Sequence, residues 1–185
     1  MQLLEGIQSR HSIGKLKAEP VDHGLIETMI AAAITAPNHH VNEPWRFVVL
    51  EGAAVHDLGD VMAQVLQREK PGVAEADLQK ERSKPLRAPV IIAVTSYEGK
   101  DPTETTENLF AVAAAVENLL LAAHHLGLAA QWRTGSAASA PELKEWLGVP
   151  LSTTIVALVY LGYADMEPKD RRRGDPKEKT VWRSS

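Results

Sequence analysis

The segment 103–126 constrains the fold of this chain more than any other part of its sequence. Apolar residues recur there at helical spacing, and the stretch 109–123 is apolar on nearly every side. A helix of this kind must be covered on several sides, either by other elements or by a second chain. Glu107, Asn108 and Glu117 interrupt it too often for a membrane span. The sequence therefore predicts a core built around this helix, which also favours a subunit interface.

The rest of the chain alternates strand and helix patterns. Runs of β-branched and aromatic residues predict strands, and apolar residues every three to four positions predict helices. The predicted strands cover 45–50, 89–96, 128–133 and 153–161, and the predicted helices cover part of the first dozen residues, 22–36, 54–68 and a segment after Ser139. Asp22 is the expected N-cap of 22–36, and Ser139 with Glu142 has the spacing of a capping box. This order predicts one α+β domain over 1–185, with a mixed, mostly antiparallel sheet flanked by helices.

Two segments do not fit the core pattern. Residues 69–87 carry many charges and little apolar material, which predicts a solvated insertion or a mobile lid. Residues 165–185 are polar until Val181 and Trp182, which predicts a C-terminal arm that docks through these two side chains.

Composition excludes several classes of function. The chain has no cysteine, so disulfides, thiolate catalysis and iron–sulfur clusters are ruled out. The formal net charge of −4 gives no overall positive field toward nucleic acid or an anionic membrane. The first dozen residues lack a basic region followed by an apolar one, so a cytoplasmic location is expected. The pairs His39–His40 and His124–His125 lack the i, i+4 spacing of helical metal ligands, and no metal site is expected.

Two polar clusters favour anion binding. Arg10-His11-Ser12 follows the first helix, and Arg133-Thr134-Gly135 follows a strand, so both offer guanidinium, hydroxyl and backbone N–H donors. Taken alone, however, arginines and serines at the ends of elements are more often solvated or capping residues. The basic run 171–173 is either a solvated tail or a source of an arginine that reaches back to a bound phosphate. There is no G-x-G-x-x-G sequence and no Walker loop, which leaves Rossmann and P-loop chemistry unsupported.

Four segments together carry a family resemblance. They are 9–16 (SRHSIGKL), 36–47 (APNHHVNEPWRF), the helix 107–127 and 131–135 (QWRTG). In order and spacing they resemble the short, minimal members of the nitroreductase family of FMN-dependent oxidoreductases, over most of the chain. The resemblance implies an intertwined α+β homodimer with FMN at the subunit interface. It also implies a ping-pong reaction in which NADH or NADPH reduces FMN, leaves, and is replaced by an acceptor such as a nitroaromatic or a quinone.

The resemblance further implies a set of cofactor-binding positions. These are Arg10, His11, Ser12, Thr35, His39, Asn42, Trp132, Arg133, Thr134 and Gly135. Arg10, Ser12 and Arg133 are similar to residues that hold the phosphate and ribityl chain, and His39 to one that approaches the flavin from the partner subunit. No side chain is named as catalytic, because the flavin carries the electrons.

Three positions depart from the family pattern. His11 replaces a frequent arginine, Gly14 a frequent basic residue, and Glu43 a frequent glutamine. Lys15 can partly replace the charge absent at position 14, and Glu43 disfavours an anionic substrate if it faces the site. These departures keep a second hypothesis open, a flavin-binding sensor or cofactor carrier without catalysis.

Overall fold

The computed structural model describes residues 2–168, 171 and 173–184. The strands are Trp45–Glu51 (β1), Val90–Ser96 (β2), Ala129–Arg133 (β3) and Thr154–Gly162 (β4). The α-helices are Leu3–Ser9 (α1), His23–Ala33 (α2), Ala53–Glu69 (α3), Glu75–Ser83 (α4), Pro102–His125 (α5), Ser136–Ser139 (α6) and Pro141–Trp146 (α7). Short 3-10 helices cover His39–Val41 (η1), Pro85–Arg87 (η2) and Pro176–Lys179 (η3).

The strands form one sheet in the order β1-β2-β4-β3, and every neighbouring pair is antiparallel. The central strand β2 is buried along its whole length, as its unbroken apolar run predicts. The α+β class with a mostly antiparallel sheet is therefore confirmed. The parallel element is a single bridge between Ser12 and Ala130 at the β3 edge.

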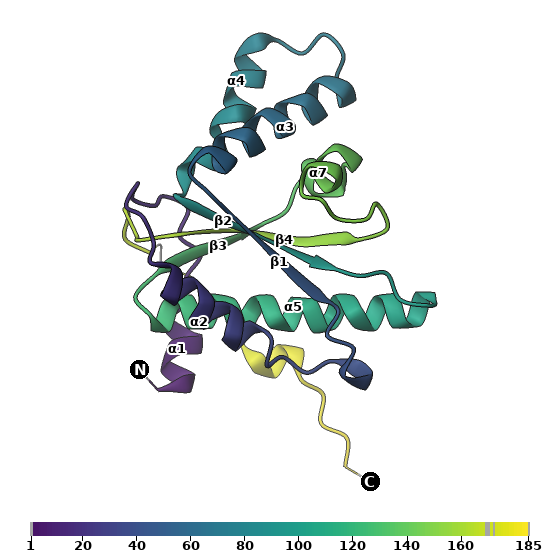
Figure 1. Ribbon diagram of the computed structural model, residues 1–185. Helices are drawn as coiled ribbons and strands as arrows, with labels where there is room; N and C mark the ends of the chain where they lie inside the picture. Colours follow the sequence, from purple (N-terminus) through teal and green to yellow (C-terminus); the bar gives the residue numbers. More distant parts are fainter. Residues whose placement is uncertain (1, 169–170, 172, 185) are drawn as a thin grey trace.

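Helices cover both faces of this sheet (Figure 1). Alternate residues of β2 point to opposite faces, so Ile92 and Val94 pack toward α2 and α5, whereas Ile91 and Ala93 pack toward α3 and α7. Helix α5 runs across the first face, and Val112, Val116 and Leu119 are fully buried there. It is long and apolar enough to cross a bilayer, but part of that surface is buried in the core of this domain.

Helix caps agree with the sequence in one case and not in another. The Asp22 carboxylate accepts a hydrogen bond from the Gly24 N–H at 2.8 Å, so the predicted N-cap of α2 is confirmed. The predicted capping box at Ser139 is wrong. The Ser139 hydroxyl donates to the carbonyl of Ser136 in the short helix α6, and α7 begins only at Pro141. The hydroxyl finds an acceptor within its own turn, which the spacing alone does not reveal.

The charged segment 69–87 contains helix α4, which packs along α3 and projects with it from the sheet (Figure 1). Leu78 is the buried side chain of α4, only 5% exposed. The Arg82 guanidinium donates to Asp60 on α3 at 3.1 Å and to Glu75 at 2.8 Å. The insertion thus forms a helical hairpin together with α3. Its role as a lid stays a prediction.

The C-terminal segment leaves the domain after β4. Its last described residues run away from the sheet (Figure 1), and Val181 and Trp182 are exposed, Trp182 to 91%. They do not dock on their own chain. That they dock on a second copy stays a prediction, and parts of the arm 165–185 lie outside the described residues.

Gly59→Ala tests how firmly α4 is seated on α3. A Cβ at Gly59 would lie 2.3 Å from the carbonyl oxygen of Arg82, so α4 must move away. This overpacking should outweigh the gain in helix propensity, which is about 1 kcal/mol. The amides of α4 are expected to lose protection in hydrogen exchange. The control is Gly174→Ala, which meets no atom within 4 Å and should change nothing. Unchanged protection of α4 in Gly59→Ala would show that the hairpin is not tightly packed.

Candidate functional site

The loop that follows α1 is held at the edge of the sheet. The Arg10 N–H caps α1 by donating to Gly6, and the Ile13 N–H donates to the carbonyl of Ala130 in β3 at 3.2 Å. Together with the bridge between Ser12 and Ala130, this fixes residues 10–13 beside β3 and the second half of α5.

This loop lines a basic cavity of about 590 Å³. Its lining residues are Arg10, His11, Ser12, Gly14, Met166, Arg171 and Arg173. The structure thus brings three of the sequence-predicted residues together with two arginines from the C-terminal run; Arg172 lies outside the described residues. No carboxylate lines the cavity among the described residues. A site with three guanidinium groups, a hydroxyl and an imidazole is suited to a phosphate group.

Arg10 links this loop to α5. Its side chain is 14% exposed, and its Nε forms an ion pair with Oε1 of Glu117 at 3.5 Å. That Nε is buried and has no hydrogen-bond partner within the described chain, so the ion pair alone compensates it.

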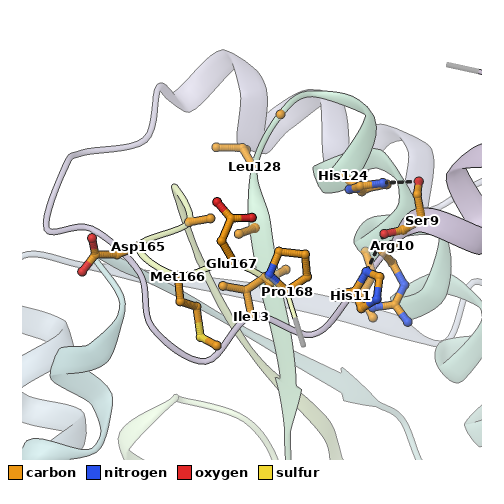
Figure 2. Close-up of a pocket in the computed structure, with 15 residues that line it drawn as sticks. Ser9, Arg10, His11, Ile13, His124, Leu128, Asp165, Met166, Glu167 and Pro168 are labelled. Carbon is orange, nitrogen blue, oxygen red and sulfur yellow. Dashed lines mark hydrogen bonds between the residues drawn. The ribbon is translucent and has the colours of Figure 1, made fainter. Parts of the chain in front are cut away.

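A second cavity of about 660 Å³ adjoins the first and shares Arg10, His11 and Met166 with it (Figure 2). At one side, Ser9 Oγ and His124 Nε2 are hydrogen-bonded at 2.8 Å. Burial lowers the pKa of His124, and the neighbouring Arg10 and His11 lower it further, which favours the neutral ring. Glu167 projects into this cavity (Figure 2), so the cavity lined by arginines is the better anion site.

The side chains of β3 divide between the two faces of the sheet. Trp132 packs against the α2 and α5 core and donates from Nε1 to the carbonyl of Val156 at 3.0 Å. The Arg133 guanidinium lies over the Tyr160 ring, 5.3 Å from its centroid, on the opposite face. Arg133, Thr134 and Gly135 line a separate small pocket and do not line the basic cavity.

Of the remaining predicted residues, His39 and Asn42 lie near the start of α5, whereas Thr35 lies beside its second half, where the Asn118 amide donates to the same carbonyl as Thr35. Thr35 donates from its hydroxyl to Ala32, His39 Nδ1 donates to Glu107 at 2.7 Å, and the Asn42 amide donates to Asn108 at 2.7 Å. Arg10 is paired with Glu117, ten residues further along α5, which corresponds to about 15 Å at the α-helical rise. Within one chain, therefore, His39 and Asn42 do not meet the basic cavity.

The loop 38–43 is strained. His40, Val41 and Glu43 have φ values of 52°, 53° and 46°, in the left-handed region that side chains other than glycine rarely adopt. Val41 is also 79% exposed, so packing within the chain does not account for its conformation. Two hydrogen bonds hold the loop in this shape. The Asn42 amide donates to Asn108, and the Glu43 N–H donates to Asn38. Such strain is typical of functional sites.

Comparison with known proteins assigns the fold. The nitroreductase family model matches residues 7–163, so the chain belongs to the nitroreductase family. A relative in Bacillus subtilis (strain 168), "Putative NAD(P)H nitroreductase YfhC", is 30% identical over 168 residues, covering 90% of this chain and 87% of YfhC. The crystal structure of a nitroreductase-like family protein from Bacillus cereus superposes with a TM-score of 0.89 at 24% identity, covering 100% of this chain and 97% of that one.

A third comparison concerns a cofactor. The crystal structure of "a putative nitroreductase in complex with FMN" from Desulfovibrio desulfuricans is 26% identical and superposes with a TM-score of 0.73. The match covers 100% of this chain and 98% of that one. The family resemblance expected from the sequence is confirmed.

Sequence reasoning missed the residues that shape the loop 38–43. Asn108 is a buried polar side chain on α5, 4% exposed, and it also donates to the carbonyl of Tyr97 at 3.4 Å. The sequence signal for Asn108 was its place, an amide in the first turns of an apolar helix. Its contact with Asn42 was not predictable from the pattern, because the two residues are far apart in sequence.

Asn108→Ala should release this loop. It removes the acceptor of the Asn42 amide and the donor to Tyr97, and buried hydrogen-bonding groups left unsatisfied cost about 1–3 kcal/mol each. The free energy of unfolding, measured by urea denaturation, should fall by about that amount. The control is Glu107→Gln, which keeps an acceptor for His39 at an exposed pair and should cost less than about 1 kcal/mol. Equal losses in both variants would contradict the role given to Asn108.

Proposed function

We propose that this protein is an FMN-dependent oxidoreductase that transfers electrons from NADH or NADPH to a small acceptor such as a nitroaromatic or a quinone. The observation that carries the proposal is the basic cavity, which gathers three arginines and no carboxylate among the described residues. FMN ends in a phosphate, and a dianionic phosphate is the ligand for which such a donor set is suited. The FMN-bound relative supports this choice of cofactor.

Arg10, Ser12, Arg171 and Arg173 would hold the phosphate of FMN. Thr134 and Gly135, at the end of β3, would contact the flavin. When bound, FMN supplies two-electron transfer in two half-reactions, first with NAD(P)H and then with the acceptor. The chain itself binds and orients the cofactor.

We further propose that the site is completed by a second copy of the chain. Within one chain Glu107, the partner of His39, lies about 15 Å along α5 from Glu117, which pairs with Arg10, so a neighbouring copy must supply His39 and Asn42 if they are to reach the flavin. Phe110 on α5 is 70% exposed, and Ile34 and Val41 are exposed apolar side chains as well. This uncovered apolar surface supports a homodimer built on α5. A chain without cysteine is in keeping with the cytoplasm, where we place it.

The phosphate assignment is tested by comparing FMN with riboflavin, which lacks the phosphate. Arg10→Ala and Arg173→Ala should each weaken FMN binding at least about tenfold, because charge-assisted hydrogen bonds contribute about 1.5–3 kcal/mol. Riboflavin binding, measured by the same quenching of flavin fluorescence, should be unchanged. The control is Arg68→Ala, which removes an arginine paired with Glu142 on the other face of the sheet. Equal losses for both flavins would contradict a phosphate site.

Turnover separates the enzyme from a sensor or a cofactor carrier. The FMN-loaded protein should oxidise NADH or NADPH only when an acceptor such as 4-nitrobenzamide is present, and initial rates should give parallel double-reciprocal lines. Flavin bound at full occupancy without turnover would favour the non-catalytic alternative.

A further inference from the structure

A third pocket lies outside the phosphate cavity, between the base of the α3–α4 hairpin and the end of β3. It is small, about 100 Å³. Met62 comes from α3, Glu81 and Lys84 from α4 and its C-cap, Arg133 from β3, and Tyr160 from β4. The pocket therefore joins the charged insertion to the strand end that carries Thr134 and Gly135.

This pocket has an excess of positive charge. Lys84 forms an ion pair with Glu81, and both side chains are largely shielded from water. Arg133 lines the pocket without an ion pair in the described part of the chain, and the same is true of Arg87 at the end of η2 nearby. Among the residues that line the pocket, Arg133 is thus an unpaired cation beside the neutralised pair of Glu81 and Lys84.

Tyr160 forms the wall between these cations. It is 4% exposed, and the Arg133 guanidinium lies over its ring. Burial raises the pKa of its hydroxyl, while the charges of Arg133 and Arg87 lower it and that of Glu81 raises it. The hydroxyl keeps its proton at neutral pH and is a donor for an anionic ligand.

We propose that this pocket is an anion subsite that takes a carboxylate group of the electron acceptor. A carboxylate fits a small pocket, and its two oxygens match the guanidinium donors of Arg133. Met62 and Leu158 supply apolar walls against which an aromatic ring attached to that carboxylate can pack. The assignment rests on the proposed function, because Thr134 and Gly135, which line the same pocket, are there placed against the flavin.

The subsite is tested with a pair of acceptors that differ in charge alone. The FMN-loaded protein is assayed with 4-nitrobenzoate and with 4-nitrobenzamide at saturating NADPH. Lys84→Gln leaves the Glu81 carboxylate facing the pocket, so it should raise the KM for nitrobenzoate about tenfold and leave that for nitrobenzamide unchanged. Arg87→Gln should act in the same direction with a smaller effect, because Arg87 is exposed and does not carry a structural contact. The matched control is Lys80→Gln, an exposed lysine on the same helix.

Two further measurements distinguish a failure of the subsite from a failure of the proposed function. Benzoate binding to the purified protein by calorimetry should be weakened about tenfold by Lys84→Gln and not by Lys80→Gln, whether or not the protein turns over. Loss of flavin binding or of nitrobenzamide reduction in the wild type would overturn the proposed function and leave this readout standing. The deciding quantity is the KM for nitrobenzoate divided by the KM for nitrobenzamide. If this ratio is the same in Lys84→Gln and Lys80→Gln, or changes only in Glu43→Gln, the subsite is overturned.

Discussion

The packing of α5 against the sheet is the interaction on which the rest of the molecule depends. Val112, Val116 and Leu119 are fully buried between β2, β4 and α2, and each contributes about 1.5–3 kcal/mol of hydrophobic stabilisation. Because α5 is fixed along its length, the positions of residues on it set the distance between the two parts of the candidate site. Glu117 lies beside Arg10 in its second half, and Glu107 and Asn108 hold the loop 38–43 near its start.

This arrangement divides the candidate site into parts that one chain cannot bring together. The basic cavity gathers three guanidinium groups, a hydroxyl and an imidazole, and the buried Arg10 Nε beside it has an ion pair but no hydrogen-bond partner within the described chain. The strained loop 38–43 carries His39 and Asn42 at the opposite end of the same helix. Both features are costly for an isolated chain, the first in desolvation and the second in backbone strain. The proposed FMN site, shared with a second copy of the chain, would account for both.

The sequence predicts the elements better than it predicts their contacts. The strand 45–50 and the helix 103–126 match β1 and α5 to within a residue or so, because apolar periodicity reflects burial directly. Helix α4 was not predicted, since it has one buried side chain, Leu78, and is held mainly by charges. Likewise, the position of Arg133 over Tyr160 depends on which face of β3 is turned toward α3, and that is decided by the packing of the whole sheet.

Subunit complementation tests the central claim, a flavin site shared between two chains, most directly. Arg10→Ala and His39→Ala chains carrying different tags are co-expressed, and the mixed dimer is isolated. If each site takes Arg10 from one chain and His39 from the other, one of the two sites in the mixed dimer has both native residues. That dimer should then bind FMN with native affinity at about half of its sites, whereas each parent dimer binds it weakly at both. Weak binding at every site of the mixed dimer, or a stable monomer that binds FMN as tightly as the native protein, would contradict the account.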